Sequence, residues 1–374
     1  MRIAVNTRFL LKNNLEGYGY FIQETLKHIT INHPEHDFIF IFDRPFDSNF
    51  VFGKNVTPVV AGPSARHPVL WKWWYDIKIP RILKRYKADV LVSLDGFCSL
   101  TTKIPQCLLI HDLAFLHYPS FNKKSETFFY KNQTPKFLSV AKSIATVSEF
   151  SKQDILSNYN LKNKNIRVVY SAGKEIFYPL SDDEKEKTKR QYTDGKEYFI
   201  FVGAIHPRKN LINLLKAFSI FKKRQQSNMK LVLTGRLAWK YQSFLESLKS
   251  YKYRNDIILT GYLGEDELVK VIGSAYAMVY PSFFEGFGVP VLEAMQCNVP
   301  VITSDNSAMK ELAGDAALYA DPARYEDIAE RMMRIYKDEN LRNELVKKGQ
   351  SIIPQYSWDK TAGLLWQSIL QAVE

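Results

Sequence analysis

Short apolar runs alternate with longer amphipathic segments along the whole chain, and both halves show the same alternation. In the first half, the runs with strand-forming composition are residues 2–8, 37–42, 89–94, 107–112, 144–148 and 166–170. In the second half, they are residues 198–204, 230–235, 256–261, 277–282, 300–305 and 317–320. Most of these runs are apolar at every position, which is typical of strands buried on both faces of a parallel sheet.

The segments between these runs have helical periodicity. In NLINLLKAFSIFKKR, the apolar side chains of Leu211, Leu214, Leu215 and Phe218 fall on one face of a helix. Strands alternating with amphipathic helices indicate α/β architecture, and 374 residues suit two domains of ordinary size. We therefore predict two doubly wound, Rossmann-like α/β domains that face each other across a cleft. The charged stretch 181–197 is interpreted as the passage between them, and its first part is also compatible with a charged helix.

Composition indicates a globular protein, with 46% hydrophobic and 14% aromatic residues, and excludes an intrinsically disordered chain. Cys98, Cys107 and Cys297 are scattered, which favours neither a disulfide framework nor a zinc site. The sequence has no signal-peptide pattern at its start and no run of about 18 apolar residues. We therefore expect a cytoplasmic protein.

The net charge of +12 is unevenly distributed. Residues 1–175 contain 24 Lys plus Arg against 14 Asp plus Glu, whereas residues 176–374 contain 27 against 25. The basic half is expected to face an anionic partner: a membrane surface, a phosphate-bearing acceptor or a nucleic acid. Residues 71–87 hold six cations interleaved with aromatic side chains. This segment fits a helix on an anionic membrane surface, and it fits equally a helix that packs its aromatic residues into the core.

In doubly wound sheets, ligands bind beyond the carboxyl ends of the strands. The run 198–204 is followed there by IHPRKN, in which Arg208 and Lys209 precede a helix whose expected N-cap is Asn210. Two cations next to a helix N-terminus favour an anion, because side-chain charge, backbone N–H groups and the helix dipole act together. A diphosphate would suit this position.

The stretch FFEGFGVPVLEAM follows the run 277–282. Its glycines permit close approach of the backbone to a ligand, and Pro290 suits the first turn of a helix. Glu285 would lie in the loop and Glu293 about one turn inside the helix. Each carboxylate can accept two hydrogen bonds from adjacent sugar hydroxyls.

These stretches resemble a known family. Residues 285–322 are similar to the nucleotide-sugar signature of the retaining glycosyltransferases of family 4, which have the GT-B fold. The resemblance extends to GAIHPRKN, IHDLAFLHYPSF, ATVSEFS and the glycine loop EGYGYF, and so covers nearly the whole chain.

The resemblance implies a role for each matching residue. Arg208 and Lys209 would bind the donor diphosphate, Glu293 the ribose hydroxyls, and Glu285 the hydroxyls of the transferred sugar. The implied catalytic residues are His111, Arg208, Lys209 and Glu285. The implied donor-binding residues are Gly17, Gly19, Gly203, Arg208, Lys209, Glu285, Gly286, Phe287, Gly288, Val289 and Glu293.

The resemblance also implies domain limits. Residues 1–178 would form the acceptor-side domain together with 357–374, which resembles a final helix that crosses back onto it, and residues 179–356 would bind the donor. The sequence departs from the family at SAGK, where Asn-Gly and an acidic residue are usual. Donor contacts from residues 171–174 therefore stay open.

The implied activity is transfer of a hexose with retention of configuration from a nucleotide-diphosphate sugar to a glycan or lipid-linked acceptor, in cell-envelope polysaccharide or lipopolysaccharide synthesis. GDP-mannose is favoured as donor and a UDP-sugar stays open. No cofactor or metal is expected, since the chain contains no Asp-x-Asp. Location at the inner face of the cytoplasmic membrane, through residues 71–87, stays open, and no nucleic-acid partner is expected. The alternatives are an epimerase of UDP-N-acetylglucosamine with the same fold and a non-catalytic protein that binds sugar nucleotides or nucleic acid.

Overall fold

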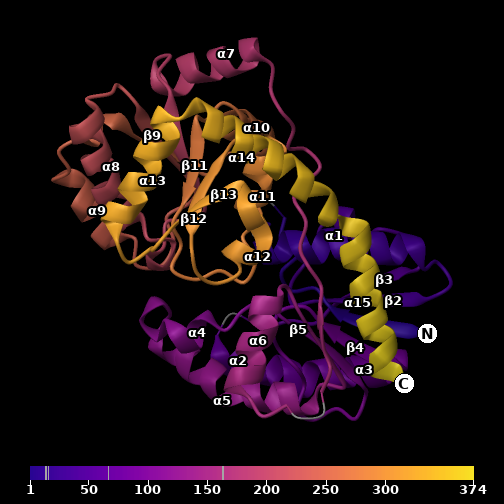
Figure 1. Ribbon diagram of the computed structural model, residues 1–374. Coiled ribbons are helices and arrows are strands. Elements are labelled where there is room, and N and C mark those ends of the chain that lie inside the picture. The colour runs from indigo at the N-terminus through magenta and orange to yellow at the C-terminus, as the bar shows by residue number, and fades with distance from the viewer. Residues whose placement is uncertain (13–14, 16, 66, 162–163) are drawn as a thin grey trace. The chain divides into compact units, whose positions relative to one another are not determined.

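The computed structural model describes residues 1–374 except 13–14, 16, 66 and 162–163. The chain divides into two compact units (Figure 1): unit 1 is Met1–Ser171 with Ser357–Glu374, and unit 2 is Ala172–Tyr356. Residues 172–178 thus belong to unit 2, whereas the sequence-based limits placed them in the first domain. The return to unit 1 begins at residue 357, as in those limits.

Unit 1 is built on a parallel sheet which, within the described residues, has seven strands in the order β3-β2-β1-β4-β5-β6-β7. The strands are β1 (Arg2–Asn6), β2 (Asp37–Phe42), β3 (Val56–Val60), β4 (Val90–Ser93), β5 (Gln106–Ile110), β6 (Ser143–Thr146) and β7 (Ile166–Val168). The helices are α1 (Gly17–Asn32), α2 (Pro68–Trp73), α3 (Ile79–Tyr86), α4 (Ala114–His117), α5 (Lys124–Val140), α6 (Glu149–Asn158) and α15 (Trp358–Val373).

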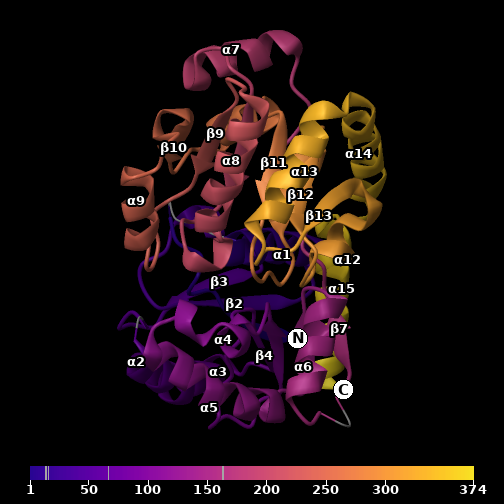
Figure 2. The same ribbon diagram turned by 60° about the vertical axis from the view of Figure 1, so that its left-hand side comes forward.

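Unit 2 repeats this plan with a parallel sheet of six strands, counted over its described residues, in the order β10-β9-β8-β11-β12-β13. The strands are β8 (Tyr198–Val202), β9 (Lys230–Thr234), β10 (Ile257–Gly261), β11 (Ala277–Tyr280), β12 (Val301–Ser304) and β13 (Ala317–Ala320). The helices are α7 (Asp182–Thr193), α8 (Leu211–Gln225), α9 (Gln242–Lys249), α10 (Glu265–Gly273), α11 (Val289–Gln296), α12 (Met309–Ala313), α13 (Tyr325–Lys337) and α14 (Glu339–Ile352). Figures 1 and 2 show α8 and α13 packed side by side against this sheet.

The two sheets confirm the predicted doubly wound architecture, and every apolar run identified in the sequence contains a strand. One strand, β3, was missed because its sequence VTPVV contains Pro58. Proline has no N–H to donate and is confined mainly to edge strands. The strand order places β3 at the edge of its sheet, paired only with β2.

The segment 71–87 contributes its aromatic residues to the core of unit 1. The side chains of Trp71, Trp74 and Tyr75 are buried there, whereas Lys72, Arg81, Lys84, Arg85 and Lys87 are exposed. The core-packing interpretation is therefore correct for these aromatic residues, and membrane contact stays a prediction that depends on the exposed cations. Within the described chain, no helix combines the length and the apolar character needed to cross a bilayer.

The C-terminal helix α15 completes unit 1. Thr361 donates a hydrogen bond to the carbonyl of Tyr170 (2.7 Å), and Ser143 on β6 donates one to the carbonyl of Ser368 (2.6 Å). The charged stretch 181–197, by contrast, is not the passage between the units. It contains α7, whose N-terminus has a capping box between Ser181 and Glu184 and which lies inside unit 2.

Two glycines at strand ends in unit 2, Gly235 just after β9 and Gly261 as the last residue of β10, allow a matched test of how closely the backbone packs there. A Cβ atom at Gly235 (φ +145°) would lie 2.0 Å from the carbonyl oxygen of Gly203, whereas one at Gly261 (φ +70°) would meet nothing within 4 Å. We expect Gly235→Ala to reduce the free energy of unfolding by roughly 3 kcal/mol or more, because backbone strain and a clash add together. Gly261→Ala should cost only about 1 kcal/mol. Urea unfolding measures both, and equal losses would contradict the packing described.

Candidate functional site

The loop after β8 carries the two cations predicted from the sequence. Gly203 follows the strand with φ +147°, and residues Pro207–Lys209 form a single 3-10 turn. His206 caps this turn, since its Nδ1 accepts a hydrogen bond from the backbone N–H of Arg208 (3.2 Å). The turn projects Arg208 and Lys209 from the carboxyl end of β8.

Asn210 lies before α8 as expected, but its side chain does not cap the helix. Its Nδ2 donates instead to the carbonyls of Pro281 (3.0 Å) and Pro322 (2.6 Å), which follow other strands of the same sheet. The backbone of Asn210 is left-handed, with φ +62°. The predicted N-cap position is therefore confirmed, but without the expected side-chain hydrogen bond to the helix N-terminus. The residue connects three loops at the carboxyl edge of the sheet.

Glu285 joins the two cations from the loop after β11. Its Oε1 lies 2.5 Å from Lys209 Nζ and its Oε2 lies 3.2 Å from Arg208 Nη1. The same Arg208 nitrogen donates to the carbonyl of Phe284 (2.9 Å). Two adjacent residues and a third that is distant in sequence, each predicted for the site, thus form one ion-paired cluster in unit 2.

Tyr280, at the end of β11, is a member of this cluster that the sequence analysis missed. Its hydroxyl accepts a hydrogen bond from Lys209 Nζ (2.7 Å) and donates one to Glu285 Oε1 (3.2 Å). Burial, together with the Glu285 carboxylate, raises the pKa of Tyr280 well above its usual value. A tyrosine at the end of a buried strand gives no sequence signal by itself, because the same residue is ordinary in a hydrophobic core.

The Glu285 carboxyl is buried, with 6% of the residue exposed. Burial alone would raise its pKa, but the charges of Arg208 and Lys209 outweigh burial and lower the pKa to about 2. The carboxylate is therefore ionised throughout the neutral range. The cluster consists of two cations and one anion, so its formal net charge is +1.

The loop between Glu285 and α11 has the predicted form. Gly288 precedes the helix with φ +108°, and a Cβ atom there would lie 2.4 Å from Met309 Cε, so the position requires glycine. Val289 and Pro290 begin α11. Phe287 is buried and its ring packs edge-on against Tyr356, with centroids 5.4 Å apart. Gly286, which is also in the predicted set, lies in the same loop.

Glu293 differs sharply from Glu285. It lies in α11 with 5% of the residue exposed, and its carboxyl has no hydrogen bond or ion pair with any part of the chain that the structure describes. Burial raises its pKa to about 7, against a smaller lowering by the charge of Lys174. A buried carboxyl group without a partner is costly, so a hydroxyl-bearing ligand that hydrogen-bonds to it would relieve that cost.

The other predicted residues lie in unit 1. His111 follows β5, and its Nε2 lies 2.9 Å from the carbonyl oxygen of Leu94. Its ring packs against Tyr18 and Phe21, with centroid distances of 4.2 Å and 5.2 Å. Burial lowers the pKa of His111 to about 4.

Gly17 and Gly19 do not lie in a loop, because α1 begins at Gly17. A Cβ atom at Gly19 would lie 2.7 Å from the carbonyl oxygen of Phe9, which explains this glycine by packing. A Cβ atom at Gly17 would meet nothing within 4 Å, so close approach of the chain gives no reason for that glycine. Glu16, the first residue of the predicted EGYGYF loop, lies outside the described residues.

Comparisons with known proteins show which family the chain resembles in sequence and which fold it shares. The family model described as Glycosyltransferase Family 4 matches residues 34–172, and the one described as Glycosyl transferases group 1 matches residues 182–352. The chain is 29% identical over 250 residues to O-antigen chain mannosyltransferase B of Escherichia coli, covering 67% of this chain and just under two thirds (66%) of that protein. It is 29% identical over 277 residues to O-antigen chain mannosyltransferase RfbU of Salmonella typhimurium, covering 72% and 71%. The structure of sucrose-phosphate synthase from Thermosynechococcus elongatus has the same fold, with a TM-score of 0.77, 16% identity, and coverage of 98% and 97%.

The raised pKa of Glu293 predicts how stability changes with pH. Because the folded protein holds this proton more tightly than the unfolded chain does, the contribution of Glu293 to stability falls as the pH rises from about 4.5 to about 7 and then stays constant. We expect Glu293→Gln to increase the free energy of unfolding at pH 8 by up to roughly 3 kcal/mol. This gain should nearly vanish at pH 4.5.

Urea unfolding at pH 4.5 and pH 8 measures the change. Exposed Glu330 on α13 provides the control, and Glu330→Gln should alter stability equally at both pH values. A pH-independent effect of Glu293→Gln would contradict the expected burial of an unpaired carboxyl.

Proposed function

The chain belongs to the glycosyltransferases of family 4, and from this premise we propose that it transfers mannose from GDP-mannose to a glycan or lipid-linked acceptor. Both relatives described above are named O-antigen chain mannosyltransferases, which supports mannose as the sugar and a surface polysaccharide or lipopolysaccharide as the product. The observation that carries the proposal is that unit 2 contains both the ion-paired cluster of Arg208, Lys209 and Glu285 and a buried carboxyl, that of Glu293, which has no partner in the described chain.

We propose that Glu293 binds the ribose of the donor. Its buried carboxyl has unused hydrogen-bonding capacity, and two adjacent hydroxyls can donate to its two oxygens. Hydrogen bonds of this kind favour the ionised form, so donor binding would lower the pKa of Glu293 below about 7. Donor binding would thereby remove the energetic cost of a buried Glu293 carboxyl that has no hydrogen-bond partner.

Arg208 and Lys209 are proposed to bind the diphosphate. In the absence of donor, part of their charge is neutralised by Glu285. A diphosphate brings additional negative charge, and the two cations can stabilise the charge that grows on it as the bond to the sugar breaks. Glu285 and the backbone N–H groups of Phe287 and Gly288 are then proposed to bind hydroxyls of the transferred sugar.

The proposal includes metal independence and retention of configuration. Two cations at the diphosphate would supply the positive charge that other transferases obtain from a metal ion. For retention, we propose that the acceptor attacks the face from which the diphosphate leaves, with the departing phosphate oxygen accepting the proton of the acceptor hydroxyl. The anomeric configuration of the product, measured by NMR, tests retention, and inversion would contradict this step.

Ligand-induced stabilisation identifies the donor. We expect GDP-mannose to raise the melting temperature of the wild-type protein more than UDP-, ADP- or dTDP-sugars do, because a ligand that binds only the native state stabilises it. Glu293→Ala should abolish the increase, whereas Glu330→Ala should preserve it. A larger increase in melting temperature with a UDP-sugar would identify that sugar nucleotide as the donor in place of GDP-mannose. No shift with any of them would contradict it.

Rate measurements test the two cations. We expect Arg208→Ala and Lys209→Ala each to reduce kcat by about 100- to 1,000-fold, the usual loss when one donor that stabilises transition-state charge is removed. Lys223→Ala, in the last turn of α8 and exposed, should keep the wild-type rate. Wild-type turnover in either test variant would refute the assignment.

The same assay tests whether a metal ion is required and whether the protein is an epimerase instead of a transferase. Activity should survive treatment with EDTA, and a loss restored by added Mg²⁺ or Mn²⁺ would show that a metal is needed. An epimerase would release a changed free sugar in the absence of acceptor. A transferase forms a new glycosidic product only when the acceptor is present.

A further inference from the structure

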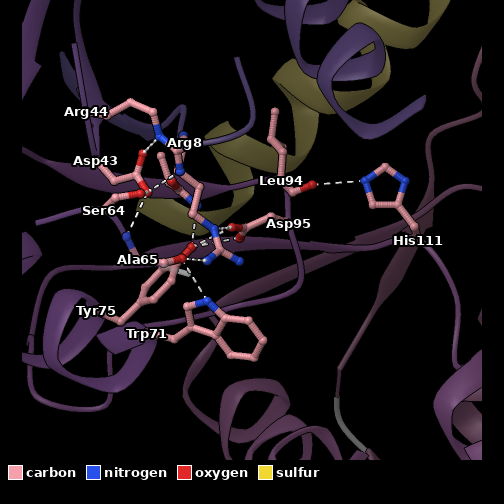
Figure 3. Close-up of polar contacts among 11 residues, drawn as sticks. Arg8, Asp43, Arg44, Ser64, Ala65, Trp71, Tyr75, Leu94, Asp95 and His111 are labelled. Carbon is pink, nitrogen blue, oxygen red and sulfur yellow. Dashed lines mark hydrogen bonds and ion pairs between the residues drawn. The ribbon is translucent and has the colours of Figure 1, made fainter. Parts of the chain in front are cut away.

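A buried ion pair lies at the carboxyl edge of the sheet of unit 1, outside the residues assigned above. Arg8, just beyond β1, has 6% of its surface exposed, and its Nε lies 2.6 Å from Asp95 Oδ2, just beyond β4. The Arg8 guanidinium also lies 4.8 Å from the ring centroid of Phe9 and 4.6 Å from that of Phe97. Figure 3 shows Arg8 and Asp95 pointing toward each other.

Asp95 is held from a second direction. The hydroxyl of Tyr75 lies 2.8 Å from each of its carboxylate oxygens, and that hydroxyl in turn accepts a hydrogen bond from Asn6 Nδ2. The Asp95 side chain is fully buried between these donors. Its position, and with it the peptide unit that joins residues 94 and 95, is therefore fixed.

This peptide unit contacts the imidazole of His111. The carbonyl oxygen of Leu94 lies 2.9 Å from His111 Nε2, as Figure 3 shows. A carbonyl can only accept a hydrogen bond, so Nε2 carries a proton. Because burial lowers the pKa of His111 to about 4, the ring is neutral near pH 7 and Nδ1 keeps its lone pair. The contact thus selects one of the two neutral tautomers.

We propose that Arg8 and Asp95 are positioning residues for His111: they fix the Leu94 carbonyl, which holds the imidazole with Nε2 protonated and Nδ1 available to accept a hydrogen bond from a sugar hydroxyl. The sugar-hydroxyl step rests on the proposed function. The tautomer does not, because it follows from contacts within unit 1.

Stability alone is a poor explanation for this ion pair. Buried pairs are often no more stabilising than apolar residues of similar volume, because removing two charges from water is costly. Arg8 also contacts the loop of residues 61–65, since its Nη1 donates to the carbonyl of Ala65 (3.4 Å), and the Ala65 N–H donates to Asp43 (2.8 Å). Asp43 is paired with Arg44, a second guanidinium in the same network. A test must therefore separate an effect on His111 from an effect on the 61–65 loop.

Imidazole ¹⁵N NMR of the donor-free protein measures the tautomer directly. His111 is assigned by the signal lost in His111→Gln. We expect the wild-type ring to be the Nε2–H tautomer and Arg8→Met to give a mixture of tautomers. Arg8→Lys, which keeps the charge, should restore most of the wild-type signal. Arg44→Met is the matched control, and it should leave the His111 signals unchanged.

An Nδ1–H tautomer in the wild type overturns the proposal, and so does a wild-type signal in Arg8→Met. If Arg8→Met does not fold because Asp95 is left unpaired, the double variant Arg8→Met/Asp95→Leu removes both charges and is measured instead. A mixture of His111 tautomers in the double variant supports the proposal, and an unchanged Nε2–H tautomer refutes it. Equal changes in the Arg8 and Arg44 variants would assign the effect to the 61–65 loop and would also refute it.

Ligand titrations identify the hydroxyl. A shift of the His111 Nδ1 signal on addition of GDP-mannose assigns the hydroxyl to the donor sugar, and a shift with methyl α-mannoside alone assigns it to the acceptor. No shift with either, under conditions in which GDP-mannose raises the melting temperature, refutes the hydroxyl contact. If GDP-mannose does not raise the melting temperature, the proposed donor fails, while the tautomer result stands independently.

Discussion

Burial of the Glu285 carboxylate requires nearby positive charge, and this requirement joins the loop after β8 to the loop after β11. An ionised carboxylate inside a protein is very costly unless it is paired and hydrogen-bonded. Arg208, Lys209 and Tyr280 meet that need, and Asn210 connects the same loops through backbone carbonyls. The ends of two strands are thereby held in one arrangement before any ligand is bound.

The second acid, Glu293, is a buried carboxyl without the charged partners that Glu285 has. Its carboxyl is as buried as that of Glu285 but has no partner in the described chain, so its pKa rises where that of Glu285 falls. Glu285 holds two loops together, whereas the hydrogen-bonding capacity of Glu293 is unused in the described chain. The surroundings of the two glutamates therefore shift their pKa values in opposite directions.

The same logic applies in unit 1, where a buried charge pair supports a neutral histidine. Arg8 and Asp95 contribute no group to the ring itself, and they act on His111 through the backbone carbonyl of Leu94. In both units the carboxyl ends of parallel strands bring distant residues together, because every strand of a parallel sheet ends at the same edge. Residues from several loops at this edge can therefore form one cluster without any change in the strands of the sheet.

The sequence by itself determined the doubly wound sheets and most of their strands, because continuous apolar runs form buried parallel strands wherever they pack. It also singled out Glu285, Glu293, Arg208 and Lys209 as candidates, since charged residues in loops and first helical turns that follow predicted strands lie where such sheets bind ligands. Only the tertiary structure decided that Tyr280 joins the cluster, that Trp71 and Trp74 are core residues, and that Gly19 is required by Phe9. These outcomes depend on contacts between residues distant in the chain, and local patterns of hydrophobicity and charge carry no record of such contacts.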